Sequence, residues 1–111
     1  MANPFLIDGL KFDFRLYVLV TSCDPLRIFL YNDGLARFAT DKYKNPSKSN
    51  YKNMFMHLTN YSINKNSKKF KIYPPEHERK LGEISHKRSV SEIYKFLDIE
   101  GYDVHRLKRD I

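Results

Sequence analysis

The sequence has a single cysteine, no long apolar run and no secretion signal. Because Cys23 has no partner in the chain, no internal disulfide and no cluster of zinc-bound thiolates is expected, and a reducing compartment is the simplest surrounding. No stretch approaches the roughly 20 apolar residues that cross a bilayer. The first residues lack the charged start and apolar run of a signal peptide. We therefore expect a soluble, intracellular protein that does not enter a membrane.

Several familiar catalytic patterns are also missing. The chain has no glycine-rich phosphate loop, and no Ser-His-Asp or Cys-His arrangement stands out. The spacing of the four histidines is not that of metal ligands; they are His57, His77, His86 and His105. No metal ligand is therefore assigned.

Acidic residues are outnumbered, with 13 Asp and Glu against 20 Lys and Arg, a net charge of +7. This balance favours an acidic partner, which is nucleic acid, an anionic membrane or an acidic protein tail. Charge alone does not choose among them. A length of 111 residues allows at most one ordinary domain.

Alternating residues predict one long strand over residues 11–21, because side chains alternate between the two faces of a strand. Its apolar side holds Phe12, Phe14, Leu16, Val18 and Val20. Its polar side holds Lys11, Asp13, Arg15 and Tyr17. Residues 27–31 and 35–40 are interpreted as two further strands, joined at Asn32, Asp33 and Gly34 by a tight hairpin. The prediction is an antiparallel β meander.

Loops and helices are expected after this meander. Residues 41–53 and 65–88 are polar and basic, so flexible loops are predicted there, with a short strand or strand end at residues 54–60. Ser89 and Glu92 have the spacing of a capping box, and Gly101 suits the end of the helix that it would start. Asp103 is a candidate cap for a second helix. Strands followed by one or two helices indicate the α+β class.

The polar side of the first strand has two readings. Mixed charge on the wet face of a half-buried strand is common and mildly stabilising. Alternatively, Lys11 and Arg15 form an anion site that Arg37 completes, since lysine meets a phosphate as a point charge and arginine grips it with two parallel bonds. His57 is likewise open between a packed side chain and a functional one.

Three motifs carry a family resemblance. They are KFDFR, GLARFAT and HLTNYSINK, within the longer stretches DGLKFDFRLYVLVTSCDPLRIFLYNDGLARFAT and MHLTNYSINK. In this order and spacing the chain resembles the tubulin–tyrosine ligase-like family, most closely the branch that adds glutamate to tubulin. The resemblance runs from about Pro4 to Lys65. It implies part of an ATP-grasp domain, in which two α+β lobes hold ATP and magnesium between them.

The resemblance also implies a reaction. A carboxylate of tubulin receives the γ-phosphate of ATP, and free glutamate attacks the acyl phosphate to form an isopeptide bond. By motif position, Arg15 and Arg37 are the implied catalytic residues, Arg15 facing the phosphoryl group and Arg37 holding the amino-acid carboxylate. The implied ATP contacts are Lys11, Asp13, Thr59 and Asn60. The implied amino-acid pocket adds Tyr61, Ser62 and Lys80, and His57 would lie near the acceptor.

Two parts of the family pattern are not found. The first lobe and the acidic magnesium motif have no counterpart among these residues, so we expect residues 1–111 to be a piece of an enzyme (a fragment, a truncated gene model or a degenerate copy) that is inactive by itself. The implied location is the cytoplasm and the microtubule cytoskeleton, including the cilium or basal body. The alternative is a non-catalytic basic module that binds acidic tubulin tails. Nucleic-acid binding is less favoured, because the aromatic residues alternate toward the core side.

Overall fold

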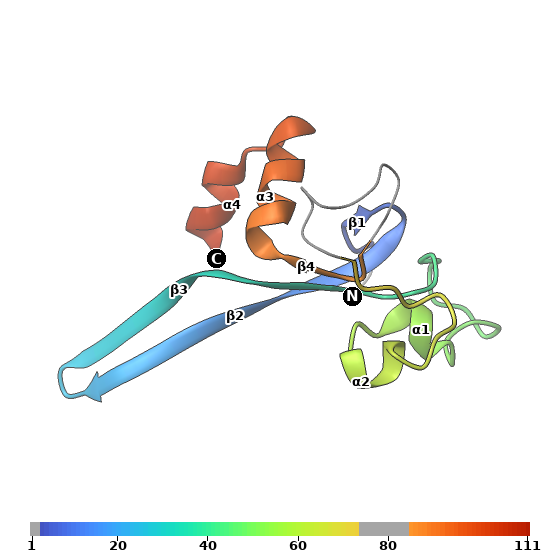
Figure 1. The fold of residues 1–111 in the computed structure, drawn as a ribbon, viewed down its shortest axis with the longest axis horizontal. Coiled ribbons are helices and arrows are strands. Elements are labelled where there is room, and N and C mark those ends of the chain that lie inside the picture. Colours follow the sequence, from blue (N-terminus) through green and yellow to red (C-terminus); the bar gives the residue numbers. More distant parts are fainter. Residues whose placement is uncertain (1–2, 74–84) are drawn as a thin grey trace.

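A long two-stranded ribbon organises the molecule (Figure 1). The structure is a computed structural model that describes residues 3–73 and 85–111. Strand β2 (Leu10–Cys23) pairs antiparallel with β3 (Leu26–Phe38), and the chain turns between them at Asp24 and Pro25. The long first strand is therefore confirmed.

The predicted hairpin at residues 32–34 is wrong, because residues 27–31 and 35–40 do not form two strands. β3 runs through Asn32, Asp33 and Gly34, and the register with β2 shifts there instead. The Asp33 carboxylate accepts hydrogen bonds from the backbone N–H of Gly34 (2.8 Å) and of Ser91 (3.0 Å). The turn-forming residues thus produce an irregularity that holds the start of a helix.

The sheet has four strands in the order β1-β2-β3-β4. β1 (Leu6–Ile7) pairs with the beginning of β2, and β4 (Lys87–Ser89) pairs antiparallel with β3. The end of the predicted loop at 65–88 is therefore a strand. β4 has only three residues and so shows no alternating pattern in the sequence; its pairing with β3 defines it as a strand. Residues 41–53 contain no helix or strand, as predicted.

Residues 54–60 are not a strand. They include helix α1 (Met54–His57), and helix α2 (Tyr61–Asn64) follows directly. Both helices are single turns, too short for a helical pattern to be recognised in the sequence. Figure 1 shows them on the opposite side of the sheet from the two C-terminal helices.

The C-terminal helices agree with the sequence. α3 (Val90–Ile99) begins at a capping box in which Ser89 Oγ accepts from Glu92 N (3.1 Å) and the Glu92 carboxylate accepts from Ser89 N (3.1 Å). Gly101 has φ +86°, which suits the end of α3, and Asp103 caps α4 (Val104–Asp110). The buried core lies between these helices and one sheet face and contains Ile7, Leu10, Ala36, Phe38, Ile93, Leu97 and Val104.

The distal half of the ribbon projects beyond this core (Figure 1). Phe12 and Phe14 pack against the core, whereas Val18 and Val20, on the same apolar side, are 58% and 50% exposed. The predicted apolar face is therefore covered only at its proximal end, because α3 and α4 reach no further.

Candidate functional site

Three charged residues form a row across the polar face of the sheet. Asp13 of β2 lies opposite Arg37 of β3, and Arg37 lies opposite Lys87 of β4. Directly paired residues point to the same face, so their side chains lie next to one another. Arg15 is two residues from Asp13 and adds a further cation on this face. The pairing of three strands, rather than the spacing along any of them, assembles the cluster.

The row borders a cavity of about 370 Å³ between the sheet and the segment that carries α1 and α2. Arg15, Arg37 and Lys87 supply positive charge to its wall. The remaining lining residues are aromatic, aliphatic or hydroxyl-bearing: Tyr17, Leu35, Phe38, Thr59, Tyr61, Phe70 and His86. This combination of convergent cations and apolar walls suits a small anionic ligand.

Arg37 lies in the wall of the cavity and forms an ion pair with Asp13, which is not itself a lining residue. The Arg37 Nε donates to one carboxylate oxygen of Asp13 at 3.1 Å, and its Nη2 donates to the other. The hydrogen bond to Asp13 raises the pKa of Arg37, although partial burial acts in the opposite direction. Arg37 therefore stays charged, and its remaining N–H groups are available to an anion in the cavity.

Asn64 holds the segment that contributes Thr59 and Tyr61. It is 1% exposed. Its side-chain oxygen accepts from the backbone N–H (3.1 Å) and hydroxyl (3.0 Å) of Thr40. Its side-chain nitrogen donates to the carbonyls of Leu58 (2.8 Å) and Asn60 (3.1 Å). One buried amide thus joins the end of β3 to the chain on either side of Thr59.

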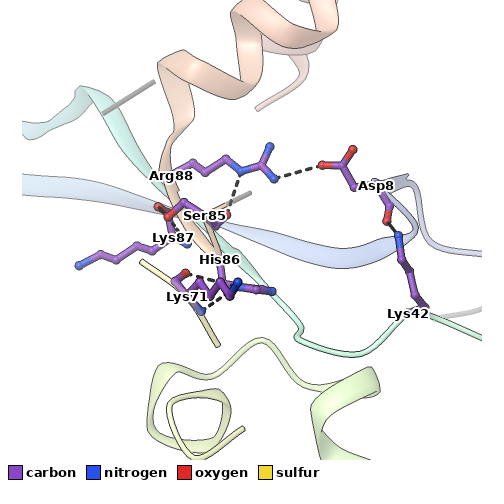
Figure 2. A network of polar contacts seen from close by, with 7 residues as sticks. All are labelled: Asp8, Lys42, Lys71, Ser85, His86, Lys87 and Arg88. Carbon is purple, nitrogen blue, oxygen red and sulfur yellow. Dashed lines mark hydrogen bonds and ion pairs between the residues drawn. The ribbon is translucent and has the colours of Figure 1, made fainter. Parts of the chain in front are cut away.

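The residues before and within β4 are held by a separate polar network (Figure 2). The Ser85 hydroxyl donates to the Lys87 carbonyl (2.7 Å). Arg88 points to the other face, where its guanidinium lies 4.4 Å from the centre of the Phe38 ring and pairs with Asp8 at 3.2 Å. With its neighbour fixed against the core, Lys87 is directed toward the cavity.

Four of the predicted site residues line this cavity: Arg15, Arg37, Thr59 and Tyr61. Lys11 does not, because its ammonium donates to the carbonyl of His57 (2.7 Å) and so ties β2 to the end of α1. Lys11 therefore does not share a hollow with the two arginines. Asp13 reaches the site through its pair with Arg37.

The other predicted residues lie beside the cavity or outside the described chain. Asn60 is the residue before α2, and Ser62 is exposed on it. The His57 ring nitrogen Nε2 lies 3.1 Å from the carbonyl of Asn50, and its ring packs edge-on against Tyr43. These contacts favour the structural reading of His57. Lys80 lies outside the described residues.

Sequence reasoning did not assign the other six lining residues to the site: Tyr17, Leu35, Phe38, Phe70, His86 and Lys87. Tyr17 had a usable signal, since it continues the polar alternation of Asp13 and Arg15. Phe70, His86 and Lys87 lie in stretches that were interpreted as solvated basic loops. Their placement depends on β4, and a strand of three residues is too short to be recognised from a pattern in the sequence.

Residues 3–73 and 85–111 contain no group of three or more His, Cys, Asp or Glu side chains arranged to hold a metal ion. Within the same residues, no helix combines the length and the apolar character needed to cross a membrane.

Comparison with known proteins gives consistent matches over the whole chain. Residues 1–111 match the model of the tubulin-tyrosine ligase family. The chain is 51% identical over all of its 111 residues to a probable beta-tubulin polyglutamylase of Tetrahymena thermophila, of which it covers 9%. It is 50% identical to human tubulin polyglutamylase TTLL6 and 48% identical to Xenopus tropicalis tubulin polyglutamylase TTLL7, covering 12% of each. The chain thus spans about a tenth of the length of these relatives.

Proposed function

Because this chain belongs to the tubulin-tyrosine ligase family, we propose that it forms part of an ATP-dependent ligase that adds glutamate to side-chain carboxylates of tubulin. The relatives named above are tubulin polyglutamylases, and this supports the choice of reaction. The proposal includes an ATP-grasp architecture. It also includes a location in the cytoplasm on the microtubule cytoskeleton, with the cilium or basal body as one site.

The observation that carries this proposal is the cation-lined cavity. Free glutamate has two carboxylates, and Arg37 and Lys87 are paired across the sheet in the wall of one cavity. Arg37 would hold one carboxylate with its free N–H groups, and Lys87 would neutralise the other. Arg15 lies on the same face and would stabilise the charge that develops during transfer. Tyr61 would close the cavity from the α2 side.

ATP and magnesium fit the described residues to different degrees. When bound, ATP supplies the phosphoryl group that activates a carboxylate. Arg15 would hold its terminal phosphate, while Lys11, Asp13, Thr59 and Asn60 stay as proposed contacts from the family motif. Among the described residues, the Asp13 carboxylate is close to the cavity through its ion pair with the lining residue Arg37, and that pair already occupies it. The described residues therefore do not fit magnesium as its ligands, and no step is assigned to them through the metal.

The test is binding of L-glutamate to the chain, measured by calorimetry. Arg37→Ala and Lys87→Met should each weaken binding at least tenfold, since a hydrogen bond to a charged group contributes about 1.5–3 kcal/mol. Lys87→Met removes a charge without leaving Asp13 unpaired. Lys95→Met is the matched control, because Lys95 is exposed on α3. Affinity that survives both cavity substitutions would refute the assignment.

Turnover is a separate question. In a longer ligase that contains this chain, Arg37→Ala should abolish ligation and leave ATP binding largely intact. The expectation that the 111-residue chain gives no turnover by itself stays a prediction. It is checked by the incorporation of labelled glutamate into tubulin.

A second candidate function is non-catalytic binding of acidic tubulin tails. Residues 41–71 hold eight lysines and one aspartate, a net charge of +7 that equals the net charge of the whole chain. All eight lysines are exposed, so this segment forms a basic surface beside the cavity. Long-range attraction of an acidic peptide to such a surface weakens as salt is added.

Charge reversal separates this candidate from the first. Lys44→Glu, Lys48→Glu and Lys52→Glu together should abolish binding of a glutamate-rich peptide at low salt. The control carries the same change in charge on α3 and α4, through Lys95→Glu, Lys108→Glu and Arg109→Glu. Equal losses in both variants would mean that only net charge matters. Preferential capture of RNA by the wild-type chain would favour a nucleic-acid partner instead.

A further inference from the structure

His86 is a buried titratable residue in the wall of the cavity. The proposed reaction assigns no role to it. It is 8% exposed. Its ring stacks on Phe70, with 5.7 Å between ring centres and 29° between ring planes. It directly precedes Lys87, and its backbone carbonyl accepts from the N–H of Phe38 (3.0 Å). The imidazole therefore lies at the junction of β4, β3 and residues 70–71.

The backbone of Lys71 offers two alternative partners to one nitrogen of this ring (Figure 2). The Nδ1 of His86 lies 3.1 Å from the Lys71 nitrogen and 3.2 Å from the Lys71 oxygen. An unprotonated Nδ1 accepts the N–H, whereas a protonated Nδ1 donates to the carbonyl. The ring can therefore change its charge without losing its hydrogen bond or leaving its place.

The charged groups around His86 disfavour its protonated form in the empty cavity. Burial is the main cause that lowers the pKa of His86, the hydrogen bond to the Lys71 backbone acts in the opposite direction, and the nearby charges of Arg88 and Lys71 lower the pKa further. Three more cations line the same cavity, accompanied by the hydroxyls of two tyrosines: Arg15, Arg37 and Lys87, with Tyr17 and Tyr61. Of the described carboxylates in this region, Asp13 is paired with Arg37 and Asp8 with Arg88.

We propose that an anion entering this cavity takes up a proton at His86, which makes His86 a proton-linked positioning residue for the bound ligand. The inference rests on the proposed function only in assuming an anionic occupant. A carboxylate in the cavity offsets the field of the cations and so favours the imidazolium. The imidazolium then attracts the ligand and stays bonded to the Lys71 carbonyl, holding residues 70–71 against β4.

The sign and size of the effect follow from linkage. An occupant that favours protonated His86 binds more tightly as the pH falls. An opposite charge at about 4–6 Å moves a pKa by roughly one or more. A pKa that rises by one corresponds to a gain in affinity of at most about tenfold, reached at pH values below both pKa values. Glutamate keeps both carboxylates ionised down to about pH 5.5, so the ligand does not mask the effect above that pH.

The experiment uses the full chain with two probes, L-glutamate and inorganic sulfate. Calorimetry at pH 5.5 and pH 7.5 should show several-fold tighter binding at the lower pH, with proton uptake from the buffer. NMR titration of the imidazole signals should show that either ligand raises the pKa of His86. In His86→Asn the amide oxygen replaces Nδ1 as acceptor for the Lys71 N–H and cannot be protonated, so the dependence on pH should vanish. His105→Asn, at an exposed histidine of α4, should behave as wild type.

Each result decides a different claim. If L-glutamate binds with the same pH profile in wild type and His86→Asn, and the His86 signals do not respond, the inference is wrong and the proposed function stands. If sulfate binds with proton uptake at His86 but L-glutamate does not bind, the proton link holds and the amino-acid assignment falls. If neither probe moves the His86 signals, the inference is overturned. Should His86→Asn fail to fold, the wild-type NMR titration decides.

Discussion

Replacing Asn64 with alanine should destabilise the protein and loosen the wall of the cavity. The Asn64 side chain makes four hydrogen bonds in a position that is 1% exposed. Alanine leaves the buried hydroxyl of Thr40 and the carbonyl of Leu58 without these partners, whereas the Thr40 N–H keeps its hydrogen bond to the carbonyl of Phe55 (2.9 Å). Each unsatisfied buried group costs about 1–3 kcal/mol, so the loss of two partners should lower the free energy of unfolding by about 2–6 kcal/mol. This is a large share of the 5–15 kcal/mol typical of a domain.

Asn66→Ala provides a matched control two residues away. The Asn66 side chain also donates to a backbone carbonyl, that of Ser62 at 3.0 Å, but it is exposed to solvent. Water can replace that bond, so the loss should stay within about 0.5 kcal/mol. The two variants thus differ in the burial of the amide rather than in its chemistry.

Urea unfolding followed by far-ultraviolet circular dichroism measures both variants. With slopes in urea similar to wild type, the shift in midpoint reports the change in stability. If Asn64→Ala unfolds within 0.5 kcal/mol of Asn66→Ala, the buried amide does not hold this segment. The proposed support of Thr59 and Tyr61 would then be wrong.

Three further changes test other parts of the fold. Gly34→Ala should lower the free energy of urea unfolding by about 1–3 kcal/mol, because a Cβ atom there would lie 2.5 Å from the carbonyl oxygen of Arg15. Gly101→Ala is the control, since nothing lies within 4 Å of its added Cβ and only the smaller effect of a positive φ is expected. Equal losses of stability in the two variants would contradict the steric argument. Ser89→Ala should lower the free energy of unfolding by about 1 kcal/mol, because it deletes the capping box of α3. If the variant loses helix content on heating at the same temperature as wild type, the capping box does not have this role. Because burial lowers the pKa of His86, the unfolded chain binds its proton at higher pH than the folded protein does; stability should therefore fall as the pH drops below about 6.5, and the urea midpoints of His86→Asn at pH 7.5 and 5.5 should differ less than those of wild type.

The local features of this chain could be read from its sequence because they depend on neighbouring residues. Alternation over residues 11–21 predicted β2, and the spacing of Ser89 and Glu92 predicted the start of α3. The motifs carrying Arg15, Arg37, Thr59 and Tyr61 also identified four lining residues of the cavity before its shape was known.

Features that depend on distant partners were not predictable in this way. The residues Asn32, Asp33 and Gly34 suit a hairpin by themselves, but β3 continues through them, with Gly34 paired to Leu16 of β2 and Asp33 accepting a hydrogen bond from the backbone N–H of Ser91. Residues 54–60 looked like a strand because α1, a helix of a single turn, is too short to show a helical period in the sequence. Lys11 was expected at the phosphates, and its bond to the His57 carbonyl arises from the position of α1.

The sequence by itself determined the long first strand, the capped C-terminal helix, the excess of positive charge and the family. Only the tertiary structure decided that Lys87 and His86 join Arg37 at one cavity, because the pairing of β3 with β4 brings together residues that are about fifty positions apart. Strand pairing over such a separation is fixed by the packing of the whole sheet, and no pattern within either strand encodes it.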